Sequence, residues 1–157
     1  MNDEAMKDET LDEARARLFA HINEGMICPC CGQFAKRYKR AFNSGQAISL
    51  INIYKTGMRS NFEWVYIPNL SAKSREEGKI AYWGLLQEKD EERDDGGRAG
   101  WWRVTPRGEH FVTNRLRIPK YVYVYNGECL GFDDTEMVTI RDCLGDDFDL
   151  GTLMGWR

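Results

Sequence analysis

One segment in the middle of the chain constrains the fold more than any other, because it alternates helix, strand, loop and strand at short spacing. Ser71 is a good N-cap for a helix over residues 72–83. Two short runs rich in strand-forming residues follow, at 85–88 and 101–105. The loop between them, residues 89–100, is charged and rich in glycine. This segment therefore predicts a β-hairpin with a long loop, preceded by a basic helix and followed by a further short helix.

The residues that precede this segment predict two helices and a strand. Thr10 and Glu13 have the spacing of a capping box, and apolar residues then repeat at helical spacing, so we expect a helix over residues 10–24. A strongly apolar helix follows from Asn43 or Ser44, and a strand is expected over residues 61–67, which Pro68 closes. Helix, strand, basic helix and long-looped hairpin follow in the order of a winged helix-turn-helix domain, with the hairpin as the wing.

The residues after this segment predict a second hairpin. Residues 120–125 alternate between tyrosine and other residues, Asn126-Gly127 is a strong two-residue turn signal, and residues 128–132 form the returning strand. The alternating tyrosines share one face of the strand and are interpreted as core, although such a row also stacks on nucleic-acid bases. Thr139 and Asp149 are N-caps for two short C-terminal helices.

The sequence therefore predicts one α+β domain. It is a winged helix-turn-helix-like domain with an N-terminal helix, a cysteine-rich turn and a C-terminal β-hairpin. The chain begins with a disordered acidic lead (residues 1–9) and the N-terminal helix (10–27). The cysteine turn and the winged helix follow (28–118), and the hairpin with its short helices (119–157) packs on the same domain.

Two stretches resemble a known group of proteins. The first is Gly78–Leu86 followed by Gly100–Gly108, and the second is Val138–Gly145 with Phe148–Leu150. Together they resemble small, uncharacterised proteins of tailed phages and prophages that begin with a Cys-Pro-x-Cys-Gly turn and continue as a winged helix. The resemblance covers roughly residues 28–155 and implies a fold more than a function. It brings no catalytic residues.

Charge is sorted along the chain, although the formal net charge is only −3. Residues 28–80 carry nine basic and three acidic side chains, whereas residues 121–157 carry two basic and eight acidic ones. A basic middle between acidic ends is expected of a DNA-binding protein, and it also fits charges that pair within one fold. The basic helix and the wing supply the predicted contacts to double-stranded DNA: Lys73, Arg75, Lys79, Arg98 and Arg103.

Two features oppose DNA binding. The wing loop is itself acidic, and no clear first helix of the helix-turn-helix pair lies between Tyr54 and Ser71. The alternative is a protein-interaction module on a winged-helix scaffold that binds a host or phage protein. A weaker alternative is a zinc-stabilised RNA binder. Either main hypothesis allows a homodimer.

The turn Cys-Pro-Cys-Cys-Gly is the candidate metal site. Cys28 and Cys31 have the spacing of a zinc knuckle, in which the turn directs both thiolates at one tetrahedral ion. A structural zinc needs four ligands, and no second such pair exists in the chain. The further candidate ligands are Cys129, Cys143 and His21. The alternative is a tight turn with reduced thiols and no metal.

Several classes of protein are excluded by what the sequence lacks. No apolar run is long enough for a membrane helix, and the acidic N-terminus is no signal peptide, so a cytoplasmic protein is expected. With two histidines and no Ser/His arrangement, phosphate loop or His-Glu-x-x-His motif, the chain is not expected to be an enzyme. The predicted role is that of a DNA-binding phage or prophage regulator.

Overall fold

The computed structural model describes residues 8–70, 77–90, 100–125 and 127–156, and the chain divides into two compact units. The first unit consists of the described residues up to Arg40 together with Tyr123–Gly131. The second consists of Ala41–Val122 and Phe132–Arg157. Both contain helices and strands, so the predicted α+β class is confirmed.

The first unit pairs one helix with a small antiparallel hairpin. Its elements are α2 (Leu11–Ala20), β1 (Met26–Ile27) and β2 (Phe34–Ala35). Thr10 caps α2 as predicted, because its hydroxyl accepts a hydrogen bond from the Glu13 N–H at 3.1 Å. The helix ends at Ala20 rather than at residue 24, since the His21 N–H already bonds the Leu18 carbonyl and a turn follows.

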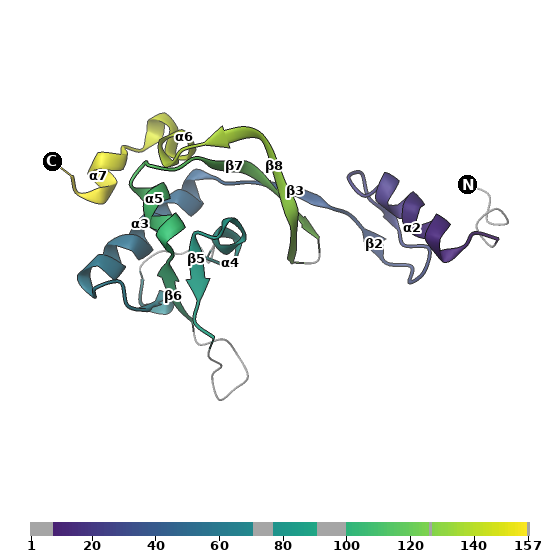
Figure 1. Cartoon of the computed structure of the whole chain (residues 1–157), viewed down its shortest axis with the longest axis horizontal. Coiled ribbons are helices and arrows are strands. Elements are labelled where there is room, and N and C mark those ends of the chain that lie inside the picture. The colour runs from purple at the N-terminus through teal and green to yellow at the C-terminus, as the bar shows by residue number, and fades with distance from the viewer. Residues whose placement is uncertain (1–7, 71–76, 91–99, 126, 157) are drawn as a thin grey trace. The chain divides into compact units, whose positions relative to one another are not determined.

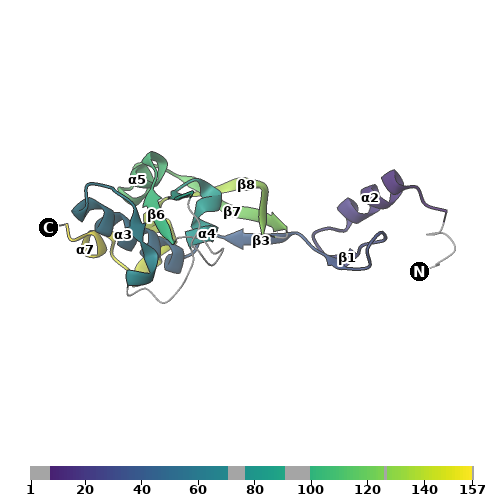
Figure 2. The same ribbon diagram turned by 90° about the horizontal axis from the view of Figure 1, so that it is seen from below.

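The remaining elements lie in the second unit or have residues in both units. Their bounds are β3 (Tyr38–Ala41), α3 (Ser44–Arg59), β4 (Val65–Tyr66), η1 (Ile67–Asn69), α4 (Glu77–Ile80), η2 (Ala81–Trp83), β5 (Leu86–Glu88), β6 (Trp101–Val104), α5 (Pro106–Val112), β7 (Ile118–Tyr125), β8 (Glu128–Val138), α6 (Ile140–Leu144), η3 (Gly145–Asp147) and α7 (Leu150–Met154). Figure 1 shows their arrangement and Figure 2 the same elements from below.

Helix α3 lies at the centre of the second unit and contacts β6, α5, α6 and α7 (Figure 1). Asn43 caps it as predicted: its side chain accepts from the Gln46 N–H at 2.8 Å, and the Gln46 side chain accepts from the Asn43 N–H at 3.0 Å. Its apolar face is buried at Ala47, Leu50, Ile51, Ile53 and Tyr54. Tertiary burial on several sides stabilises this helix more than its own propensity does.

Strand β6 is the middle strand of an antiparallel sheet ordered β4-β6-β5. Adjacent residues of a strand face opposite sides of a sheet. Trp102 is 8% exposed and packs inward, whereas Trp101 is 36% exposed on the other side. The two neighbouring tryptophans therefore face opposite ways, and the Trp101 side of the sheet is the more exposed one.

The strand predicted over residues 61–67 is confirmed only for the two residues of β4. Asn61 and Phe62 have φ angles of 61° and 60°, in the left-handed region that strands do not use. The Phe62 N–H donates a hydrogen bond to the last turn of α3, and its ring lies 5.6 Å from that of Tyr54. These residues therefore close the end of the helix instead of extending the sheet.

A second sheet has the strand order β3-β7-β8, so the predicted C-terminal hairpin is present. Its second strand continues to Val138, beyond the predicted residue 132. The interpretation of the tyrosines of β7 as core is wrong. Val122 is fully buried, whereas Tyr121 and Tyr123 are half-buried and Tyr125 is 39% exposed. The side chains of β7 that pack in the core are Ile118 and Val122, whereas Val124 is half-buried like the two tyrosines.

The two short C-terminal helices begin where the sequence predicts. Thr139 and Asp149 cap α6 and α7, each accepting from a backbone N–H three residues later. Helix α7 is held to α3 by the Lys55 ammonium group, whose Nζ donates to the Leu153 carbonyl at 2.9 Å. Leu150 is buried beneath it.

Three aromatic rings join the hairpin to the rest of the second unit. Phe42 lies edge-on to Trp83 and to Phe111, with centroid distances of 5.1 and 5.4 Å. The Trp83 indole N–H donates to the Pro119 carbonyl at 2.7 Å. Phe42 follows β3, Trp83 belongs to η2 and Phe111 to α5, so these rings pack the start of β7 against the helical part of the second unit.

Candidate nucleic-acid interface

The residues predicted to contact DNA are described only in part. Lys73, Arg75 and Arg98 lie outside the described residues, as does the first half of the helix predicted over 72–83. The described second half is α4 followed by the 3-10 turn η2, and Lys79 is exposed on it. Arg103 is exposed on β6. Ile80, Trp83 and Leu86 form the inward face of this segment, because all three are buried.

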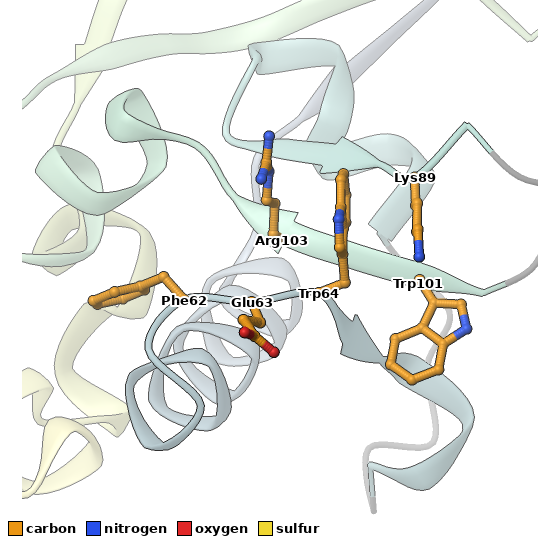
Figure 3. A pocket seen from close by; sticks show the side chains of 6 residues that line it. All are labelled: Phe62, Glu63, Trp64, Lys89, Trp101 and Arg103. Carbon is orange, nitrogen blue, oxygen red and sulfur yellow. The ribbon is translucent and has the colours of Figure 1, made fainter.

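Arg103 belongs to a group of aromatic and basic side chains on the open side of the β4-β6-β5 sheet. We call this group the Trp64–Trp101 surface; it consists of Trp64, Tyr66, Lys89, Trp101 and Arg103. Most of these residues line a shallow pocket of about 420 Å³, which Phe62 and Glu63 complete (Figure 3).

The Arg103 guanidinium lies over the indole of Trp64, 4.3 Å from the ring centroid. Its Nε–H also donates to the Gln87 side-chain oxygen at 3.1 Å, from the position directly opposite on β5. In Figure 3 the Trp64 ring is seen edge-on, with Arg103 on one side and Lys89 on the other. The stacked ring and the amide hold the guanidinium in one orientation, which lowers the entropy lost when it binds an anion.

Trp101 is the exposed platform of the same surface. Its ring stacks on Tyr66, directly opposite on β4, at a centroid distance of 4.9 Å and an angle of 32°. The Lys89 Nζ lies 5.9 Å from the Trp101 centroid. Glu63 is the acidic residue at the edge of this pocket. The arrangement offers an exposed aromatic ring beside two cations, which suits a ligand that combines planar or sugar surfaces with phosphate groups.

Sequence reasoning found Arg103 but missed the rest of this surface. The missed residues are Trp64, Tyr66 and Lys89, and the signal for two of them was present in the alternation of Trp64 and Tyr66 before Pro68. Alternation predicts which side of its own strand a residue faces. It does not predict which distant strand pairs with that strand. Only the register of β4 against β6 brings Tyr66 to Trp101.

The first unit contains a second group of basic and aromatic side chains. The Arg37 guanidinium lies 4.1 Å from the ring centroid of Tyr123. Lys36 Nζ and the Arg40 guanidinium each lie 5.3 Å from the Tyr38 ring. Tyr123, which the sequence predicts to be a core residue, thus stacks against a guanidinium group instead. The side chains of this unit also combine positive charge with aromatic surface.

Two backbone hydrogen bonds close the cysteine turn. The Gly32 N–H donates to the Cys28 carbonyl at 2.9 Å, and the Cys28 N–H to the Gln33 carbonyl at 2.7 Å. Backbone N–H groups of Cys31 and Cys30 hydrogen-bond the Cys28 sulfur and lower the pKa of its thiol, as do its contacts with the thiols of Cys31 and Cys30. Cys28 and Cys31 are therefore brought together as predicted.

The other candidate ligands do not complete a metal site within the described residues. Nowhere in this part of the chain do three or more His, Cys, Asp or Glu side chains form a group that could hold a metal ion. Cys129 is exposed, and the His21 Nδ1 lies 3.0 Å from the Arg17 carbonyl oxygen. Burial raises the pKa of the Cys143 thiol to about 12. Zinc at Cys28 and Cys31 stays a prediction.

Comparison of the chain with protein-family models, with curated proteins and with solved structures found no match. The resemblance to phage proteins therefore stays a prediction as well. None of the helices among the described residues is long and apolar enough to cross a membrane.

Proposed function

We propose that this protein binds double-stranded DNA and that its second unit is a winged helix. The strand order β4-β6-β5 supports the fold, because a winged helix places its third strand between the first and the second. Helix α3 precedes β4, the α4–η2 segment lies between β4 and β5, and residues 89–100 connect β5 to β6 as a wing would. The resemblance to phage proteins favours a role as a phage or prophage regulator.

The Trp64–Trp101 surface carries this proposal. It lies on and beside the strands that would form the base of the wing, and it presents Arg103 and Lys89 on either side of the Trp64 ring, next to the exposed Trp101 (Figure 3). Arginine and lysine neutralise phosphates and release counterions, and this release makes affinity depend on salt. The indole of Trp101 supplies apolar surface for the sugar edge between phosphates. A basic face and an aromatic face at the same place favour nucleic acid over a purely apolar protein partner.

The test measures binding of a fluorescent duplex at several salt concentrations. Arg103→Gln removes one cation, so we expect weaker binding and a slope of log affinity against log salt that is shallower by about 0.9. Trp101→Ala removes apolar contact without changing charge, and we expect about tenfold weaker binding, or about 1.4 kcal/mol, at an unchanged slope. Arg141→Gln and Trp156→Ala are the matched controls, since both residues are exposed on the C-terminal helices or the residues after them.

Three results would contradict the proposal. If the wild-type protein does not bind duplex DNA even at about 50 mM salt, the result favours the protein-interaction alternative. Variants of the Trp64–Trp101 surface that bind as well as the two controls would show that DNA contacts another surface. Tighter binding to the single strand than to the duplex would replace groove binding by stacking on unpaired bases.

A further inference from the structure

We propose that Cys28 and Cys31 of two copies of this chain together bind one zinc ion, so that the cysteine turn is a metal-dependent dimerisation site. The inference goes beyond DNA binding and does not depend on it. It starts from a site that has the geometry of a knuckle but half the ligands that zinc requires.

The turn already has the conformation that places two sulfurs on one side. Strands β1 and β2 pair as Met26 with Ala35 and Ile27 with Phe34, which closes a short hairpin over the cysteines. Gly32 has φ +75°, a left-handed conformation that glycine adopts without strain, and no atom lies within 4 Å of where its Cβ would be. The Cys28 sulfur accepts hydrogen bonds from the backbone N–H groups of Cys31 and Cys30, which hold it at the mouth of the turn.

The number of ligands indicates a second chain. Structural zinc is bound tetrahedrally by four side chains, and sets of cysteine thiolates select zinc among the common divalent ions. Within the described residues no third His, Cys, Asp or Glu joins Cys28 and Cys31 in a metal-binding group. A second copy related by a two-fold axis supplies an identical pair and completes four thiolates around one ion. The site is incomplete without that copy.

The surface around the turn supports contact with another protein surface. Ile27 and Phe34, the residues paired at the end of the hairpin, are 57% and 60% exposed. Leu11 of α2 is 61% exposed and lines a small pocket of about 190 Å³ together with Cys28 and Pro29. Exposed apolar side chains gathered at one place mark an interaction site. Zinc would fix the two turns, and these residues would be covered by the partner's matching residues.

The experiment uses the full chain, purified in reductant and stripped of metal, with no DNA present. Zinc is added in steps while light scattering measures mass and elemental analysis measures bound metal. We expect half an equivalent of zinc per chain, a doubling of mass, and a return to the monomer when a chelator is added. Cobalt in place of zinc is expected to give the absorption of a tetrahedral four-thiolate site.

Substitutions identify the ligands. Cys28→Ser and Cys31→Ser should each abolish zinc uptake and dimerisation, whereas Cys30→Ser and Cys129→Ser are matched controls that should retain both. A mixture of wild type with either ligand variant should not form stable mixed dimers, because three thiolates leave the site open. Chelator on the wild type separates loss of metal from loss of folding in the variants.

The proposal is overturned by a full equivalent of zinc in a monomer, which would mean that all ligands come from one chain. It is also overturned if the chain takes up no zinc, or if Cys30→Ser is as damaging as Cys31→Ser. None of these outcomes affects the DNA-binding proposal, whose test measures a different surface with a different probe.

Discussion

Gly108 is the residue at which a single methyl group should disturb the proposed wing most. It is buried in the first turn of α5, and its N–H donates to the Thr105 hydroxyl at 3.0 Å. A Cβ built at this position overlaps the Leu85 carbonyl oxygen and lies 2.7 Å from Cγ1 of Val104. The same carbonyl accepts the Thr105 N–H at 3.1 Å, so it cannot turn away without breaking that bond. Helix α5 therefore packs so closely on the β5–β6 hairpin that its backbone at Gly108 lies against the backbone at Leu85.

The expected cost follows from two opposing terms. Alanine in place of glycine within a helix gains at most about 1 kcal/mol. Overpacking a well-packed site costs about 1–3 kcal/mol, and the upper end applies here because the obstacle is backbone rather than a flexible side chain. We expect Gly108→Ala to lower the free energy of unfolding by about 2–3 kcal/mol. Gly78→Ala is the matched control: this helical glycine is exposed with nothing within 4 Å of an added Cβ, so a gain of up to about 1 kcal/mol is expected.

Urea unfolding followed by tryptophan fluorescence measures this effect in the right part of the molecule, because all five tryptophans belong to the second unit. The midpoints of the two variants should move in opposite directions at a similar slope. Gly108→Ala with wild-type or higher stability would refute the close packing of α5 on the hairpin. The same result would remove the physical reason for glycine at this position.

Two further predictions concern cysteine reactivity and helix capping. At pH 8 a maleimide should modify Cys28 well before Cys143, because the pKa of the Cys28 thiol is lowered and the pKa of Cys143, raised to about 12, keeps that thiol neutral. Peptide mapping measures both rates. The prediction is contradicted if Cys143 in the folded protein is modified as fast as the exposed Cys129. Asn43→Ala removes the cap of α3 and should lower the free energy of unfolding by about 1 kcal/mol in the same urea assay. Asn43→Asp should keep most of this stability, because aspartate also caps helices. Equal losses in both variants would contradict the capping role.

Local signals predicted the ends of helices better than the extent of strands. Asn43, Thr139 and Asp149 were found because a cap depends on a residue and its neighbours three positions later. The predicted strand over 61–67 was mostly wrong because Asn61 and Phe62 adopt left-handed conformations, which alternation of residue types does not reveal.

The candidate site depends on pairings between distant segments, and the sequence predicts these poorly. Adjacency in a strand is enough to place Trp101 and Trp102 on opposite faces, and the structure agrees. The partners of Trp101 and Arg103, however, come from β4 and from the segment before it, and nothing local indicates that register. The tyrosines of β7 show the same limit, because a row at period two defines one face but not whether that face is buried.

The bond from Lys55 to the end of α7 has a consequence for any shortened form of the protein. Its ammonium group, part-buried on α3, donates a hydrogen bond to the Leu153 carbonyl, so the last short helix supplies an acceptor for a charge within the second unit. Removing α7 would leave that cation without its acceptor and would uncover the side of α3 that Leu150 shields. Helix α7 thus seals one side of the central helix. A chain trimmed before α7 would expose a hydrated, charged gap beside α3.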